Sequence, residues 1–182
     1  MGFPMSLLGQ TTNLPAARRL RREEDGAALL EMTVILPFLI VLGLGIFEFS
    51  NMLYQYHLIT AGVRDAGRYA AGLPKPATID QTETCDVTAP QSTPLGCAKL
   101  LAVTGQIAAL DAPKRIGWWE ESDIVVNYVA LDPPDPDLRG GNPFKVVVFT
   151  QVVYDDIGFL DALGLGPIPI ATSHEERHYG IR

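Results

Sequence analysis

Two histidines near the C-terminal end have the spacing that most directly suggests chemistry. The stretch HEERH, from His174 to His178, matches a pattern in which two histidines on one helical face bind zinc and the glutamate acts as a general base. That chemistry needs a helix and a third ligand. Here the stretch follows GPIPIATS, which indicates an extended chain, and in a strand the two histidines would lie about 13 Å apart. We therefore predict a polar strand end, with no bound metal and no peptidase activity.

The other polar clusters offer little chemistry. Asp132, Asp135 and Asp137 lie in the acidic segment DPPDPDLRGGNP and carry oxygen ligands of the kind that calcium prefers, but the prolines fix the backbone poorly for such a site. No Ser-His-Asp set, phosphate-binding loop or dinucleotide fingerprint is present in the sequence. We expect no enzyme activity and no cofactor. The net charge of -7 argues against nucleic acid as a partner, because phosphate binding needs a positive field.

Cys85 and Cys97 are the only two cysteines of the chain, so one internal pairing is possible. Two cysteines cannot make a four-cysteine zinc site. If the segment lies outside the membrane, it is in an oxidising compartment, and the closed loop would stabilise the fold by about 3 kcal/mol in the chain-entropy model. We predict a disulfide between them.

A long apolar run follows the acidic cluster at residues 23–25. From Met32 to Leu53 it is long enough to cross a hydrocarbon core of about 30 Å. Glu31, just before this run, and Glu48, inside it, can each lie near one face of the bilayer. A dense arginine cluster at residues 18–22 precedes the run. Because such clusters stay cytoplasmic, we predict a membrane segment at about residues 32–54, with the N-terminus inside and the remainder outside. An ordinary uncleaved anchor is an alternative.

The same region resembles a known family. Gly26 followed by Glu31 is similar to the prepilin processing motif, in which cleavage follows the glycine. The first 70 or so residues resemble the TadE-like family of tight-adherence (Tad) pilus proteins. The matching features are Gly26, Glu31, Pro37, the Glu48–Phe49 pair, Gln55 and the run VRDAGRYA with Arg64, Arg68 and Tyr69.

The resemblance implies roles for four of these positions. A prepilin peptidase would cleave between Gly26 and Ala27, and Glu31 would then pair with the Ala27 amine of a neighbouring subunit. Pro37 would loosen the helix so that subunits can leave the bilayer. The sequence departs from the family's pseudopilins at Met32, where an aromatic residue is common, and members of this kind can also stay whole in the membrane.

The rest of the chain indicates an α+β fold. The apolar helix continues from Leu53 to Ala71, and GLPKPA ends it. A second helix is expected at residues 97–110. Three strands follow, DIVVNYVAL, FKVVVFTQVVY and the weaker IPIATSHEERHY. We predict a long N-terminal transmembrane helix that continues into a small periplasmic head, with helices packed on a short antiparallel sheet, as in pilins.

These observations predict three parts: a cytoplasmic basic leader at residues 1–26, a long helix at 27–72 and a periplasmic head at 73–182. The resemblance implies a minor pilin or pseudopilin in the bacterial inner membrane that acts in pilus biogenesis and adhesion. Its partners would be the lipid bilayer, other Tad pilus subunits, the assembly machinery and the prepilin peptidase. The alternative is a permanently anchored envelope protein that binds a partner through its periplasmic head.

Overall fold

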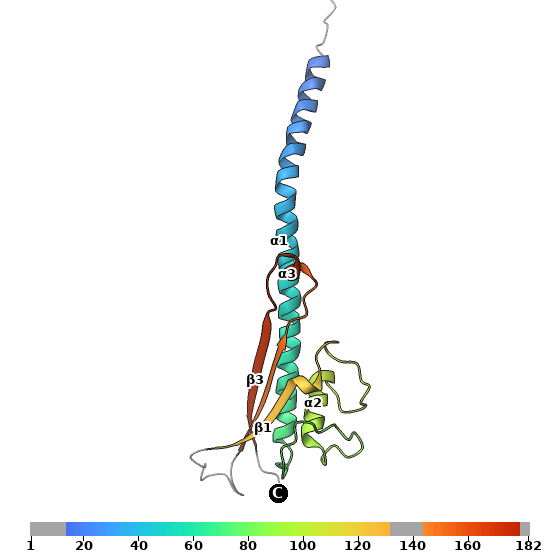
Figure 1. The fold of residues 1–182 in the computed structure, drawn as a ribbon. Helices are drawn as coiled ribbons and strands as arrows, with labels where there is room; N and C mark the ends of the chain where they lie inside the picture. Colours follow the sequence, from blue (N-terminus) through green and yellow to red (C-terminus); the bar gives the residue numbers. More distant parts are fainter. Residues whose placement is uncertain (1–13, 132–143, 179–182) are drawn as a thin grey trace, which may run out of the picture. The chain divides into compact units, whose positions relative to one another are not determined.

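A computed structural model describes residues 14–131 and 144–178 of the chain, with side chains from Gly26 onward (Figure 1). The acidic segment considered for calcium, with Asp132, Asp135 and Asp137, lies outside these residues. The chain divides into two compact units, Met1–Ile46 and Phe47–Arg182, called here the N-terminal and C-terminal units. The elements in order are α1 (Leu14–Ala71), α2 (Pro94–Thr104), the 3-10 turn η1 (Glu121–Asp123), β1 (Ile124–Ala130), β2 (Phe144–Val153), α3 (Phe159–Ala162) and β3 (Pro169–Arg177).

Helix α1 has 58 residues and includes Pro37 in its interior. It begins at Leu14, earlier than the residue 27 expected from the sequence, because residues 16–24 are all alanine, arginine, leucine or glutamate, which are good helix formers. It ends at Ala71, as expected. The N–H of Gly72 closes the last turn by donating to the carbonyls of Arg68 and Tyr69, and the prolines that follow cannot continue the helix.

The predicted α+β fold is confirmed. In the C-terminal unit the three strands form an antiparallel sheet in the order β1-β2-β3. Alternate residues of β1 and β2 are buried, as expected for a sheet with one covered face. The core joins this face to the last part of α1 and to α2. Its fully buried members include Ile59, Val63, Ala66, Ala70, Leu95, Ala98, Trp119, Ile124, Val126, Val146 and Val148.

Helix α2 is shorter than the sequence suggests and begins earlier. It spans Pro94–Thr104, with proline in its first turn, where a missing N–H costs nothing. It stops because Gly105 adopts a left-handed conformation with φ 81° and donates its N–H to the carbonyl of Leu101, a cap that residues with a Cβ rarely adopt. The expected continuation to Leu110 is therefore wrong.

The last part of α1 lies in close contact with α2. A Cβ on Gly62 would lie 2.4 Å from the carbonyl oxygen of Ala102 and 2.8 Å from the ring of Trp119. Only glycine permits this approach. The spacing of Gly62, Ala66 and Ala70 along one face therefore serves packing within the C-terminal unit.

Candidate functional site

The N-terminal unit carries an apolar helical segment that the described residues do not cover. The stretch Gly26–Ala71 of α1 contains an 18-residue window of mean hydropathy 2.4, and none of that window is buried. Between Leu29 and Phe47 the large apolar side chains are 41–73% exposed. Such a surface needs an apolar surrounding, so the helix is consistent with membrane anchoring.

The residues that the pilin resemblance singles out lie at the start of this segment. Gly26, Ala27, Glu31 and Pro37 are all exposed. Among the described residues, Glu31 has no hydrogen-bond or ion-pair partner. Any partner for its carboxylate would therefore come from outside this part of the chain. The structure places the four residues on one helix and leaves their predicted roles untested.

Glu48 is buried in the C-terminal unit, and sequence reasoning missed this. Only 4% of the residue is exposed. The Tyr154 hydroxyl donates a 2.7 Å hydrogen bond to its Oε1 atom, and the N–H of Ile157 donates to the same atom at 3.3 Å. Burial, and then the hydrogen bond to Glu48, raise the pKa of Tyr154 to about 12. The prediction of an acid at the membrane face overlooked that β2 and the following loop enclose this carboxylate.

Two further polar residues of α1 continue this contact. Asn51 donates from Nδ2 to the Tyr154 hydroxyl at 2.8 Å, and Gln55 accepts a 3.2 Å hydrogen bond from the Trp118 indole. Glu48, Asn51 and Gln55 are spaced by three and four residues, so they share one helical face. That spacing within an apolar run was the available signal for a helix face bound by protein.

Farther along α1, an ion pair attaches the helix to the segment that follows α2. Arg115 donates from a guanidinium nitrogen to the Asp65 carboxylate at 2.5 Å. With Gly62, this contact holds the α2 region against α1.

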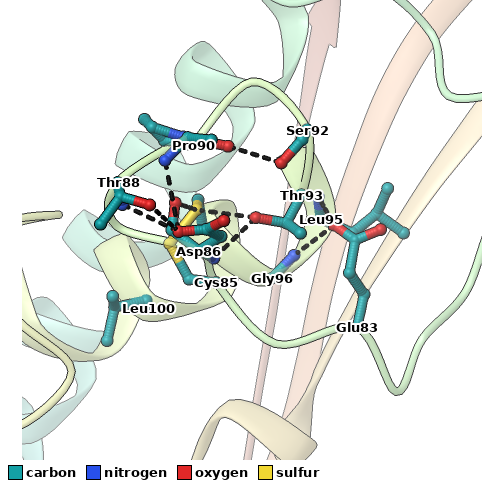
Figure 2. The surroundings of a disulfide bond; sticks show 12 residues. Glu83, Cys85, Asp86, Thr88, Pro90, Ser92, Thr93, Leu95, Gly96 and Leu100 are labelled. Atoms are coloured by element: carbon teal, nitrogen blue, oxygen red, sulfur yellow. Dashed lines mark hydrogen bonds between the residues drawn. A yellow bond between two sulfur atoms is a disulfide. The ribbon is translucent and has the colours of Figure 1, made fainter.

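The predicted disulfide between Cys85 and Cys97 is confirmed (Figure 2). It joins the loop after α1 to the first turn of α2, and both sulfur-bearing residues are buried with Leu100. Glu83 reinforces the same connection, because its carboxylate accepts hydrogen bonds from the backbone N–H groups of Leu95 and Gly96 at 3.0 and 3.2 Å. These free N–H groups at a helix start attract a carboxylate.

Two aspartates stabilise turns within the same loop. The Thr82 hydroxyl and N–H donate to Asp80, and those of Thr88 donate to Asp86. In each case the hydroxyl hydrogen bond is the largest cause that lowers the pKa of the aspartate. The loop is therefore held by its own side chains as well as by the disulfide.

The loop also covers the open edge of the sheet. The side-chain amide of Gln81 donates to the carbonyl of Val126 at 2.7 Å and accepts from its N–H at 3.3 Å. The ammonium group of Lys99, a residue only 3% exposed, donates to the backbone carbonyl of Gln81. Because β1 is an edge strand, these contacts block a position at which another strand could pair.

The stretch from His174 to His178 is extended, as predicted. Most of it lies in β3, where His174 is paired with Val148 of β2. His174 packs against Gly67 of α1, and the His178 ring nitrogen lies 2.6 Å from the Leu73 carbonyl. Within the described residues no group of three or more His, Cys, Asp or Glu side chains could hold a metal ion. Because this stretch is extended, the helix that the zinc-protease pattern requires is not formed.

Together, an uncovered apolar helix and an α+β C-terminal unit with a three-stranded antiparallel sheet define a pilin-like protein. Residues 26–68 match the TadE-like protein family, so the chain carries a TadE-like domain in this region. No curated protein and no solved structure matches the chain. A TadE-like domain is consistent with a Tad pilus assembly protein. TadE-like pilus proteins are structural and non-enzymatic.

Proposed function

We propose that this protein is a minor pilin or pseudopilin of a tight-adherence pilus, which acts through packing in pilus biogenesis and surface adhesion. One observation carries the proposal. The TadE-like match at residues 26–68 includes the apolar segment that the described chain leaves uncovered. The segment therefore has the composition for two successive surroundings, a bilayer before assembly and neighbouring apolar helices after it.

The contacts of Glu48 support an earlier end for the membrane segment than the sequence suggested. Glu48, Asn51 and Gln55 bind side chains and backbone of the C-terminal unit, and we therefore place the membrane segment at about residues 27–47. A helix of this length spans about 31 Å, which is enough for a bilayer. The arginines at residues 18–22 support a cytoplasmic N-terminus, and the disulfide supports a periplasmic location for the C-terminal unit.

In the proposed mechanism, a prepilin peptidase removes residues 1–26 and exposes the amine of Ala27. The Glu31 carboxylate of one subunit then pairs with this amine on a neighbour. Inside an apolar bundle an unpaired carboxylate is costly, so subunits in the wrong register would be disfavoured. The exposure of Glu31, and the lack of a partner for it among the described residues, support an intermolecular partner.

Two measurements in cells that carry a working Tad system test the proposal. N-terminal sequencing of the membrane-extracted protein should find a chain that begins at Ala27. Deleting the gene should abolish piliation and surface adhesion, and the intact gene should restore both. Normal pili in the deletion strain would overturn the proposed role in assembly.

A permanently anchored envelope protein is the second candidate, and Met32 is the observation that favours it, because an aromatic residue is common after the glutamate in cleaved members. This candidate predicts a mature chain that retains residues 1–26. It also predicts that Gly26→Ala leaves function unchanged, whereas the pilin proposal predicts loss of cleavage and of pili.

A further inference from the structure

The segment between β2 and β3 displays apolar side chains to solvent. We call residues 155–166 the α3 loop. Ile157, Leu163 and Leu165 are 57%, 52% and 53% exposed. Leu165 borders an open hollow of about 350 Å³ between the loop and the end of β2. The C-terminal unit therefore does not use these side chains in its core.

Internal hydrogen bonds nevertheless order the loop. The Asp156 carboxylate accepts from the N–H groups of Leu160 and Asp161 at 3.1 and 3.2 Å, and the Leu165 N–H donates to the Leu160 carbonyl at 2.9 Å. Gly158 and Gly164 have φ values of 94° and 69°, which lets the chain turn sharply at both ends of α3. The apolar side chains are thus presented by a defined turn.

The loop is attached to α1 at Glu48. The Ile157 N–H donates to the Glu48 carboxylate at 3.3 Å, and Tyr154, just before the loop, donates to the same carboxylate at 2.7 Å. In the chain, Glu48 directly follows the apolar run that ends at Phe47. The hydrogen bonds to Glu48 and the chain connection from Phe47 to Glu48 therefore keep the loop close to the point where the proposed membrane segment ends.

We propose that the α3 loop inserts Ile157, Leu163 and Leu165 into the outer leaflet of the bilayer beside this point. The inference rests on the membrane anchoring in the proposed function, and it does not depend on the pilus role. We name a lipid surface as the partner of the loop, because the loop is hydrogen-bonded to Glu48 and Glu48 directly follows the segment proposed to enter the lipid. The contact is apolar, since Asp155 and Asp161 are exposed on the loop and would be repelled by anionic headgroups.

Depth-dependent fluorescence quenching tests the proposal in the full chain reconstituted in phosphatidylcholine nanodiscs, one chain per disc. The native cysteines form a disulfide, so a third cysteine can carry an environment-sensitive dye. Labels at Leu163 and Leu165 should be quenched by lipids with a nitroxide near the headgroup. A label at Leu110, which is 63% exposed outside the loop, is the matched control and should stay unquenched.

A label at Leu39, near the middle of the proposed membrane segment and read with lipids that carry a nitroxide deep on the acyl chain, separates the two ways of failing. Quenching at Leu39 without quenching at Leu163 and Leu165 would overturn the loop contact and leave the anchor intact. Absence of quenching at all three positions would overturn the anchor and the loop contact together. A blue shift at Leu163 without quenching by lipid would show that protein covers the loop, which also contradicts the proposal.

Variants provide a second test. The double substitution Leu163→Ser and Leu165→Ser should abolish lipid quenching of a label at Ile157, whereas Leu110→Ser should leave it unchanged. Emission from the buried Trp119 should remain native in both, because all three leucines are exposed. Full quenching at Ile157 in the double variant would contradict a contact made by these leucines. Replacing part of the lipid with phosphatidylglycerol should weaken the quenching, and stronger quenching would contradict an apolar contact.

Discussion

The hydroxyl of Tyr154 donates a 2.7 Å hydrogen bond to the carboxylate of Glu48, across a sequence separation of 106 residues. This contact joins the end of β2 to the first turn of α1 within the C-terminal unit. It defines where α1 stops being an uncovered apolar helix and starts being part of a protein core.

We expect Glu48 and Tyr154 to be energetically coupled. Glu48→Gln and Tyr154→Phe should each destabilise the C-terminal unit, and a double-mutant cycle should give a coupling of about 1 kcal/mol, because an amide oxygen accepts a weaker hydrogen bond than a carboxylate and phenylalanine removes the donor. Urea unfolding of the full chain in detergent, followed by tryptophan emission, measures this. Strictly additive effects would mean that the hydrogen bond contributes nothing to stability.

This contact also shows where sequence reasoning was insufficient. The sequence was enough to predict the long helix, the strands and the disulfide, because apolar runs, β-branched runs and a lone cysteine pair are local signals. The partner of Glu48, Tyr154, lies about 100 residues later in the sequence, and no residue near Glu48 identifies it. The polar face of Glu48, Asn51 and Gln55 could have indicated a bound helix face, although not the side chain that binds it.

The end of α2 and the α3 loop were missed for related reasons. The apolar residues after Thr104 fit a helix pattern, but the left-handed Gly105 overrides it. Helix α3 has only four residues, too few for any periodicity. Its geometry depends on two glycines and on the Asp156 carboxylate, and such a turn is recognised only once its hydrogen bonds are seen.

The contact between α1 and α2 predicts a steric penalty at Gly62. Gly62→Ala should destabilise the C-terminal unit by about 1–3 kcal/mol, because the added Cβ would overlap the Ala102 carbonyl oxygen and force the helices apart. The same unfolding assay measures it. Gly117→Ala is the matched control, since nothing lies within 4 Å of its Cβ position. Equal stability of the two variants would refute the close helix contact.

The disulfide should contribute most of the stability of the loop before α2. Replacing both cysteines with alanine should lower the free energy of unfolding by about 3 kcal/mol, since the bond closes a loop with a sequence separation of 12. Mass spectrometry without reduction should find the two peptides linked in protein taken from cells. Two free thiols in that protein would contradict a native disulfide.

The same loop should weaken in acid. Hydrogen bonds from Thr88 lower the pKa of Asp86 below its ordinary value of 3.8. A carboxyl with a lowered folded-state pKa contributes stability that is complete above 3.8 and is lost as the pH falls through the lower folded value. An NMR titration should therefore place the Asp86 midpoint below 3.8.

Thr88→Val tests the cause of that shift. It removes the hydroxyl donor and keeps the shape, so the Asp86 midpoint should move up toward 3.8. Thr104→Val is the matched control, because the Thr104 hydroxyl lies 2.7 Å from the backbone carbonyl oxygens of Leu100 and Gln106 and donates to this pair rather than to a carboxylate. A midpoint that does not respond to Thr88→Val would mean that the hydroxyl does not set this pKa.

The most direct measurement of the central claim is surface piliation, together with co-purification of other pilus subunits, in cells with Glu31→Ala at matched levels of membrane-inserted protein. Insertion should be preserved, because the change removes an acid from the edge of an apolar helix, and folding should be preserved, because Glu31 is exposed. Thr33→Ala, two positions away, is the control and should assemble normally. A substitution at Glu48 is not a suitable control, because Glu48 is buried and hydrogen-bonded to Tyr154. The account predicts loss of pili in Glu31→Ala, since a neighbour's amine is left buried without its partner at a cost of about 3–5 kcal/mol, and an intermediate level in Glu31→Gln. Normal piliation and co-purification in Glu31→Ala would contradict it and would favour a permanently anchored envelope protein.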